Sequence, residues 1–353
     1  MNSNFDRPMQ RVGPLAVLPD MLVEFGVEPE QVFAGLGFGP DDMLTENRIP
    51  FDTALALLDR AVRLSGNPSF GLLLGARHDH KVMGVVGELM SVAPTLRRAL
   101  ENYIALQPAY SGGACVYLVP MGDCYALGYG IYDRHAPGAD QVYALTMSLG
   151  TNMVRALSGG VAKPVETHLC YRPPIDLGPY DKLLDSRFSF NESQTCLFLP
   201  KETLDAPNPT ADAASHAELS GLIAARVPLN AQSAAARLRH ILRPALSLGE
   251  TSLGMAAEHL GLSERSLNRK LLQEGTSFAR ERDLVRFRMA CELLLLTDLP
   301  IWQISDALSY ANHTAFIRSF RRWSGNAPAD WRKAHSSQQP TLAGLRVTTL
   351  AQS

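Results

Sequence analysis

The chain has 353 residues and a mass of 38.5 kDa, with 46% hydrophobic and 19% charged residues. This length exceeds one small domain, and the apolar content excludes a chain that is disordered throughout. No apolar run approaches the roughly 18 residues needed to span a bilayer. The first residues also lack the basic and apolar segments of a secretory signal. We therefore expect a soluble, cytoplasmic protein with no membrane partner.

The formal net charge of -2 hides two oppositely charged parts. Residues 1–236 contain 17 Lys and Arg against 25 Asp and Glu, a net charge of -8. Residues 237–335 contain 15 against 10, a net charge of +5. An acidic body followed by a basic block indicates that only the second part meets a polyanion.

The N-terminal part changes its hydrophobic period along the chain. Residues 14–106 are predicted to be helical, with one apolar stripe at Phe51, Leu55, Leu58 and Val62 and another helix opened by Pro94 in its first turn. Period-two alternation then predicts a hairpin over 114–131, followed by a helix at 139–157. Three further strands are predicted at 165–171, 187–191 and 195–199. Residues 1–210 are thus expected to form an α+β domain of helices on a mainly antiparallel sheet.

One face of the predicted hairpin carries only small residues, namely Ala126, Gly128 and Gly130. Such a face allows close approach to the backbone, either by a ligand or by a packed helix, and the helix is the commoner case.

The region 211–236 is expected to be a linker, because turn-forming and small residues cluster at its start and Pro228 lies inside it. An all-α domain is expected at 237–335. Residues 336–353 have too little apolar periodicity to pack and are expected to be a flexible tail.

The basic block contains a helix-turn-helix pattern. A short helix at 255–260 is followed by a turn at Gly261, and Ser263 is a suitable N-cap for a second helix that runs to about 273. Ala257 provides the small side chain that two steeply crossing helices need, and Leu267 and Leu271 provide the buried contacts. This motif places its second helix in the major groove of DNA.

The pattern then repeats. Residues 301–308 repeat the first helix, Asn312 caps a new helix, and Phe316 and Phe320 follow Leu267 and Leu271 at a separation of 49 residues. A continuous helix is predicted between the motifs at 277–296. A helix of about 20 residues is about 30 Å long, close to the roughly 34 Å between major-groove openings on one face of DNA. The two recognition helices are therefore expected to read neighbouring grooves from one side.

These residues resemble the DNA-binding domain of the AraC/XylS family of bacterial transcription regulators. The match is carried by Gly261-Leu-Ser-Glu-Arg-Ser-Leu-Asn-Arg-Lys-Leu271, Glu274-Gly-Thr-Ser-Phe278, Leu299-Pro-Ile-Trp-Gln-Ile-Ser-Asp-Ala-Leu-Ser-Tyr310 and Phe316-x3-Phe320-Arg-Arg-Trp-Ser-Gly-Asn-Ala-Pro328. Two departures are Ser309, where the family usually has Gly, and Asn326-Ala327, where a less polar pair is common.

The N-terminal part resembles the arabinose-binding-like effector domain of ornithine-responsive AraC regulators. Its landmarks are Gly26-Val-Glu-Pro-Glu30, Asn67-Pro-Ser-Phe-Gly-Leu-Leu-Leu-Gly75, Gly84-Val-Val-Gly87, Pro94-Thr-Leu-Arg-Arg-Ala-Leu100, and Pro174-x5-Tyr180 with Phe188-x-Phe190. Tyr171 stands where that family often has His. The resemblance implies sensing of a small-molecule effector, self-association as a homodimer, activation of transcription and RNA polymerase as a partner. It does not identify the effector.

The candidate base-reading residues face away from the apolar stripes of the two recognition helices. Arg pairs with guanine and Asn with adenine, each good pair discriminating by about 1–3 kcal/mol. The candidates are Arg265, Asn268 and Arg269 on the first helix and His313, Thr314 and Arg318 on the second.

Hydroxyl groups near helix starts and further arginines are candidates for phosphate contacts. These are Ser263, Ser266, Thr276, Ser277, Arg280, Arg286, Arg321 and Arg322. Some of these arginines are expected to pair instead with Glu274, Glu281 or Asp283 within the protein.

Candidate effector contacts are less specific. Tyrosines offer apolar rings with polar tips, and His168 and Arg172 could bind an anion; core packing and fold-stabilising hydrogen bonds are the structural alternatives. The candidate set is Tyr103, Tyr125, Tyr129, His168 and Arg172.

Other chemistry finds little support. P-loop, dinucleotide, H-E-x-x-H and G-x-S-x-G motifs are absent, and the five cysteines form no C-x-x-C pair. The pair His78 and His80 has no identifiable third metal ligand. We expect no cofactor, no metal and no enzyme activity.

The sequence thus predicts a sequence-specific regulator that binds double-stranded DNA, with an activator favoured by the resemblance. One alternative is a repressor or constitutive regulator whose N-terminal domain only oligomerises. A second alternative, from another class, is an enzyme with a fused DNA-binding domain.

Overall fold

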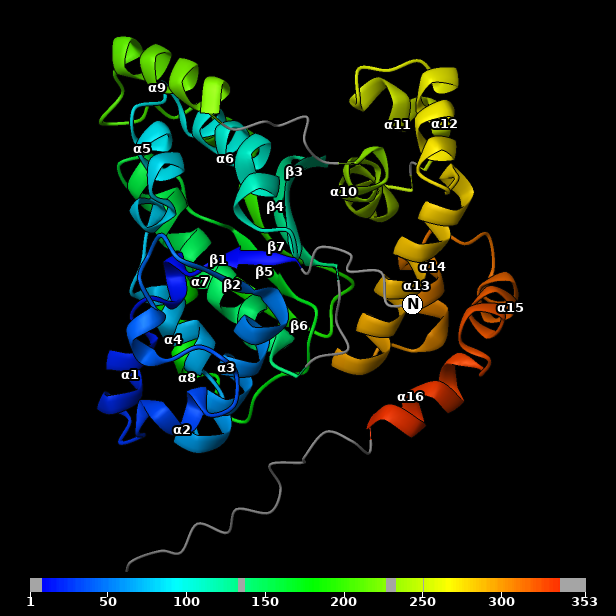
Figure 1. Cartoon of the computed structure of the whole chain (residues 1–353), viewed down its shortest axis with the longest axis horizontal. Helices are drawn as coiled ribbons and strands as arrows, with labels where there is room; N and C mark the ends of the chain where they lie inside the picture. The colour runs from blue at the N-terminus through cyan, green and yellow to red at the C-terminus, as the bar shows by residue number, and fades with distance from the viewer. Residues whose placement is uncertain (1–7, 133–136, 227–232, 250, 337–353) are drawn as a thin grey trace, which may run out of the picture.

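The computed structural model describes residues 8–132, 137–226, 233–249 and 251–336. An N-terminal α+β body and a C-terminal all-helical domain lie side by side in it (Figure 1). The predicted fold class is therefore confirmed. Within the described ranges, no helix is both long and apolar enough to cross a membrane.

The larger sheet of the N-terminal body has five strands in the order β3-β4-β7-β5-β6. All neighbours are antiparallel except β5 and β6, as predicted for a mainly antiparallel sheet. A separate antiparallel pair joins β1 to β2. The strands are β1 (Met9–Arg11), β2 (Arg48–Pro50), β3 (Ala114–Met121), β4 (Cys124–Ile131), β5 (Glu166–Leu169), β6 (Arg187–Phe190) and β7 (Thr195–Pro200).

Helices surround this sheet and share one apolar core with it. The long helix α7 packs against the sheet through β7, and α4 packs along α7. Helix α6 begins after Thr95, whose hydroxyl accepts from Arg98 N at 3.2 Å, so Pro94 precedes the N-cap and does not lie in the first turn. The helices are α1 (Leu18–Glu24), α2 (Pro29–Phe33), α3 (Phe51–Ser65), α4 (Phe70–Ala76), α5 (Val85–Ser91), α6 (Leu96–Tyr110), α7 (Ala139–Leu157) and α8 (Gly178–Leu184).

Part of the expected linker is helical. Residues 213–226 form α9 (Ala213–Arg226), which lies on the N-terminal body, where His216 Nε2 is 2.9 Å from Asn102 Nδ2. Residues 227–232 of the expected linker, and residues 337–353 of the expected tail, lie outside the described residues.

The C-terminal domain begins with α10, which starts before the expected boundary at residue 237. Its helices are α10 (Ala234–Ser247), α11 (Leu253–His259), α12 (Glu264–Gln273), α13 (Phe278–Leu296), α14 (Ile301–Ala307), α15 (His313–Ser324) and α16 (Pro328–Ser336). Both predicted helix-turn-helix units and the helix between them are present.

Helix α10 approaches the small-residue face of the hairpin at Gly130, which supports the helix interpretation at that position. The side chain of Arg243 crosses Gly130 so closely that a Cβ there would lie 1.7 Å from Arg243 Nε. Beside it, the ring of Tyr117 from β3 fills the space above Gly128. The missing side chain of Gly130 thus leaves room for the contact between the two domains.

We predict that Gly130→Ala weakens docking of the C-terminal domain on the sheet. Displacing the buried Arg243 side chain should cost about 1–3 kcal/mol, as overpacking does elsewhere. Thermal unfolding of the full chain measures the loss, and Gly221→Ala is the control because a Cβ at Gly221 meets no atom within 4 Å. Equal melting temperatures for the two variants would contradict the prediction.

Candidate nucleic-acid interface and ligand cavity

The first recognition helix is held by a short turn and a buried stripe. Gly261 takes the left-handed conformation, with φ 65°, between α11 and α12. Ser263 caps α12 by accepting from Ser266 N at 3.2 Å. Leu267 and Leu271 are fully buried, which turns the opposite face of α12 outward. Arg265, Asn268 and Arg269 are all exposed on that face.

The second recognition helix repeats this construction. Asn312 Oδ1 accepts from Ala315 N at 2.9 Å and caps α15, while Phe316 and Phe320 are fully buried. His313, Thr314 and Arg318 are exposed.

The departure from the usual glycine at the second turn has a structural explanation. Ser309 adopts φ 56°, a left-handed conformation that costs free energy for a residue with a side chain. Its hydroxyl donates to the carbonyl of Leu246 at 2.6 Å. This bond ties the second turn to the end of α10, which offsets part of the strain.

Helix α13 separates the two motifs and has 19 residues, which corresponds to about 28 Å. In Figure 1, α12 and α15 both lie on the side of the C-terminal domain that is turned away from the N-terminal body. Neither recognition helix is packed inward against the other domain.

The phosphate candidates divide into free and engaged groups. Arg280 and Arg321 are exposed, and neither forms an ion pair with another described residue. Arg322 Nη2 instead lies 2.9 Å from Asp283 Oδ2, an internal pairing of the expected kind. The hydroxyl of Thr276 donates to Glu281 Oε1 at 2.6 Å. Ser277 caps α13 by accepting from Arg280 N at 3.3 Å.

Arg286 requires a correction of the phosphate set. Its Nε donates to Leu308 O at 3.0 Å and its Nη2 to Ser309 O at 2.9 Å, while its guanidinium lies over the ring of Tyr310. This side chain satisfies carbonyls at the end of α14 and has a structural role, so we leave it out of the candidate DNA contacts.

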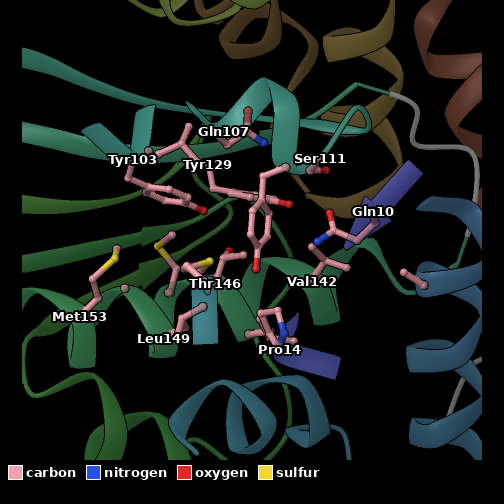
Figure 2. Close-up of a pocket in the computed structure, with 18 of the residues that line it drawn as sticks. Gln10, Pro14, Tyr103, Gln107, Ser111, Tyr129, Val142, Thr146, Leu149 and Met153 are labelled. Carbon is pink, nitrogen blue, oxygen red and sulfur yellow. The ribbon is translucent and has the colours of Figure 1, made fainter. Parts of the chain in front are cut away.

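A cavity of about 80 Å³, measured as the space open to the centre of a water molecule, lies in the N-terminal body. Tyr103 and Gln107 of α6 and Tyr129 of β4 face Thr146, Leu149 and Met153 of α7 across it (Figure 2). Most of its lining is apolar, as is typical of small-molecule sites.

Two of the five predicted effector residues line this cavity, namely Tyr103 and Tyr129. Burial raises the pKa of both phenols, so both remain protonated donors. Gln107 and Ser111 also line the cavity and were missed, because nothing local in the sequence distinguishes them from other polar helix residues.

The other three predicted effector residues lie elsewhere. Tyr125 packs under the guanidinium of Arg97. His168 lies between Glu166, at 2.9 Å, and Glu192, at 3.5 Å. Arg172 binds the C-terminal domain, with Nε 2.7 Å from Asp298 Oδ1 and two further bonds to the carbonyls of Leu295 and Thr297.

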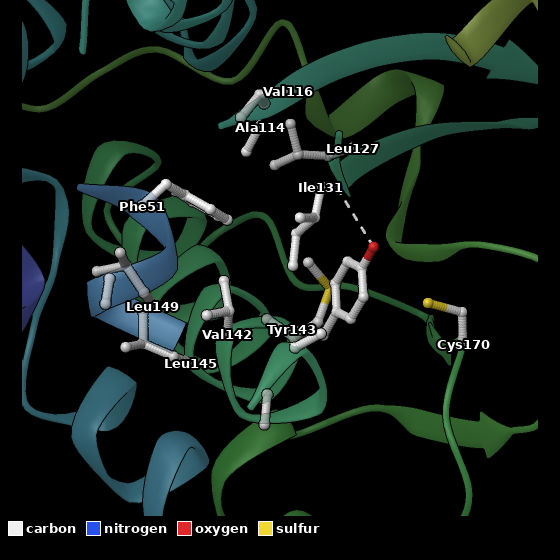
Figure 3. Packing of buried hydrophobic residues seen from close by; sticks show 14 of the residues in the cluster. Phe51, Ala114, Val116, Leu127, Ile131, Val142, Tyr143, Leu145, Leu149 and Cys170 are labelled. Atoms are coloured by element: carbon white, nitrogen blue, oxygen red, sulfur yellow. Dashed lines mark hydrogen bonds between the residues drawn. The ribbon is translucent and has the colours of Figure 1, made fainter. Parts of the chain in front are cut away.

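A buried polar cluster joins the two domains next to the cavity. The hydroxyl of Tyr143, on α7, donates to Glu292 Oε1 on α13. It also accepts from Ile131 N at 3.3 Å (Figure 3). Arg243 Nη2 donates to Glu292 Oε2 at 3.2 Å, and Cys170 Sγ lies 3.8 Å from Glu292 Oε1. The sequence signal for this cluster is one acidic residue inside the apolar run from Met289 to Leu296.

Comparison with known proteins agrees with both domains. A family model described as the arabinose-binding domain of AraC transcription regulators matches residues 26–208, and a helix-turn-helix domain model matches residues 256–334.

Similar full-length proteins are regulators. The ornithine utilization regulator of Pseudomonas aeruginosa is 28% identical over 94% of this chain and 98% of its own length. The regulator VirS of Mycobacterium tuberculosis is 25% identical over 75% of this chain and 78% of its own length. The solved structure of the transcriptional regulator CdpR from P. aeruginosa covers 94% of this chain and 100% of its own, with 22% identity and a TM-score of 0.47.

We predict that docking of the two domains weakens in acid through His240. Its Nδ1 is 2.8 Å from the hydroxyl of Tyr132, and burial lowers the pKa of His240 from 6.5 to about 4. The docked state therefore binds fewer protons than the separated state. The extra stability of the docked state is fully present above pH 6.5 and is lost as the pH falls toward 4. Over this range the equilibrium constant for docking falls by at most about tenfold per pH unit.

Small-angle scattering of the full chain across this pH range measures the opening. His240→Asn keeps a hydrogen-bond acceptor for Tyr132 and removes the titration, so its curve should stay flat between pH 6.5 and 5. An identical pH profile for the variant would assign the opening to other groups.

Proposed function

Because the chain belongs to the AraC family of transcription regulators with an N-terminal arabinose-binding-type domain, we propose that it is a cytoplasmic, sequence-specific regulator controlled by a small molecule in the cavity. The coarser function, a DNA-binding transcription regulator, is common to its relatives. The activator role, the homodimer and the contact with RNA polymerase belong to the proposal.

The observation that carries the proposal is the pair of exposed polar faces on α12 and α15. Arg265, Asn268 and Arg269 on one helix, and His313, Thr314 and Arg318 on the other, are assigned to the base edges. Ser263, Ser266 and Ser277, which lie near helix starts, are assigned to phosphates together with Arg280 and Arg321. The hydroxyl of Ser263 donates to Ser266 Oγ at 3.0 Å, that of Thr276 donates to Glu281, and Arg322 pairs with Asp283. These three are assigned to phosphates on the condition that DNA replaces their internal partners.

Effector control is proposed to act through α7. Val142, Thr146, Leu149 and Met153 line the cavity, whereas Tyr143 on the same helix binds Glu292 of the other domain. A ligand that favours one position of α7 would thereby favour one arrangement of the domains, which is the differential interaction that any effector needs.

The name of the P. aeruginosa relative ties that protein to ornithine utilization. The mainly apolar lining of the cavity in this chain favours a less polar ligand than ornithine. A repressor with the same architecture remains the alternative for the sign of regulation, and reporter transcription from the bound promoter separates the two. We do not propose an enzyme. Catalytic turnover of a substrate by the full chain would favour that alternative.

We predict that Arg265→Ala or Arg269→Ala lowers affinity for the specific operator by about 1–3 kcal/mol, roughly 5- to 150-fold, with a small effect on unrelated DNA. The operator is first selected from genomic DNA bound by the wild-type chain. Gel-shift titrations at one fixed salt concentration then measure both affinities.

Arg280→Ala is the matched control. As a phosphate contact, it should weaken operator and unrelated DNA by similar factors and reduce the salt dependence. If Arg265→Ala or Arg269→Ala lowers the affinity for operator and for unrelated DNA by equal factors, that arginine does not read bases.

We further predict that Tyr143→Phe loosens the domain interface. A hydrogen bond to a charged group contributes about 1.5–3 kcal/mol, so amide exchange in α10 and the second half of α13 should rise about tenfold or more. Tyr180→Phe is the control, since Tyr180 is equally buried but bonds to Tyr171, at 3.2 Å, within the N-terminal body. The same pattern of exchange in both variants would contradict a specific role for Tyr143.

A further inference from the structure

The cavity offers no charge to a ligand. None of the side chains that line it within the described ranges belongs to Asp, Glu, Lys, Arg or His. The guanidinium of Arg11 binds the hydroxyl of Tyr110, a lining residue, but it is paired with Glu46. A charged ligand would lose its hydration here without gaining a counter-ion, which is costly in an apolar site.

Two buried polar atoms in the lining have no partner. Gln107 is 1% exposed, and its Nε2 donates to Ala114 O at 3.0 Å, which fixes the orientation of the amide. Its Oε1 accepts from no described group, and Ser111 Oγ, 4% exposed in the residue as a whole, is likewise unpartnered. An unsatisfied buried polar atom costs about 1–3 kcal/mol. Both residues line the cavity, so a ligand there can supply the missing partner once these side chains adjust to it.

The partner must donate a hydrogen bond, because Gln107 Oε1 can only accept. It can also accept, since Ser111 carries a hydroxyl and the phenol-bearing residues Tyr103 and Tyr129 line the same cavity. One group that both donates and accepts is a neutral hydroxyl. Opposite it, Leu145, Leu149 and Met153 present an apolar wall.

We propose that this cavity binds a small neutral molecule with an apolar body and a hydroxyl group, such as an alcohol or a phenol. The hydroxyl donates to Gln107 Oε1 and accepts from Ser111 or a tyrosine. The cavity leaves about 80 Å³ for the centre of a water molecule, which is room for a small ligand such as a single substituted ring. Its regulatory meaning rests on the proposed function, but its binding does not.

Bound water is the competing occupant, because a cavity of this size with a few polar groups in its lining can hold water molecules. Water alone would provide hydrogen-bond partners for Gln107 and Ser111, but it would leave the apolar wall in contact with water instead of with an apolar group. Titration with matched probes separates the two occupants.

The experiment is calorimetry of the full chain with 4-methylphenol, toluene, 4-methylbenzoate and ornithine. We expect 4-methylphenol to bind with a dissociation constant of about 1 mM or below, given its few non-hydrogen atoms. Toluene should bind at least fivefold more weakly, and the two charged probes should not bind. A cavity that holds only water predicts no binding of any probe, and that result would overturn the proposal.

Variants identify the contact. Gln107→Met and Ser111→Ala should each lower the affinity for 4-methylphenol by about fivefold or more, as expected for the loss of one hydrogen bond. The affinity for toluene should stay within twofold of that of the wild-type chain. Unchanged melting temperatures confirm that the variants fold. Leu222→Ala, at an exposed position on α9, is the control and should change neither affinity. Equal losses for 4-methylphenol and toluene would refute recognition of the hydroxyl.

Operator affinity with and without 4-methylphenol separates this inference from the proposed function. Binding without any change in operator affinity would retain the ligand class and reject its role as an effector. If ornithine binds and changes operator affinity, the proposed ligand class is rejected and control by an effector is retained.

Discussion

The carboxylate of Glu292 lies where the two domains meet, and it is 2% exposed. A buried carboxylate is tolerated only when it is paired and hydrogen-bonded, since removing it from water costs several kcal/mol. Here Arg243 supplies the charge, and Tyr143 donates a hydrogen bond. Arg243 belongs to α10, Glu292 to α13 and Tyr143 to α7. Because the buried carboxylate of Glu292 needs both partners, it holds these three helices in one arrangement. Replacing a buried ion pair by apolar groups is often neutral for stability, so we infer that this pair serves mainly to specify one arrangement of the domains.

Several features of β4 and its neighbours follow from that arrangement. Gly130 leaves room for Arg243, and the bonds from Arg172 to the end of α13 extend the contact along the other side of the interface. The groups of the C-terminal domain that make these contacts belong to α10, to the second half of α13 and to Thr297 and Asp298 just after it. Helices α12 and α15 take no part in these bonds among the described residues. The contact with the N-terminal body therefore leaves both recognition faces open.

Local sequence signals predicted most of the helices and strands, because each depends on residues close together in the chain. They missed the short strand β2 inside the stretch 14–106 that was expected to be helical, and they placed Pro94 inside the first turn of α6. Ser263 and Asn312 cap the recognition helices as expected, and the 49-residue repeat of buried Leu and Phe residues is present. The cavity was predicted only in part. His168 pairs with Cys196 and through it with Gly128, which places it on the face of the sheet opposite Leu197 and Tyr129. Register of this kind between distant strands cannot be read from composition. The Arg243 and Glu292 pair joins positions 49 residues apart on two helices, and only their packing against the sheet reveals the partnership.

Helix α7 connects the cavity with the interface through its own geometry. Val142, Thr146, Leu149 and Met153 recur at helical spacing and form one stripe, and Tyr143 follows one residue after the first of them, rotated by about 100° toward the C-terminal domain. A helix moves as a rigid body over such short distances, so a ligand that displaces the stripe also displaces the Tyr143 hydroxyl. A hydrogen bond weakens steeply with distance and angle, and the acceptor is a buried charge that has few alternatives. A small movement on the cavity side is therefore converted into a change of free energy at the domain interface, far from the surfaces that face DNA.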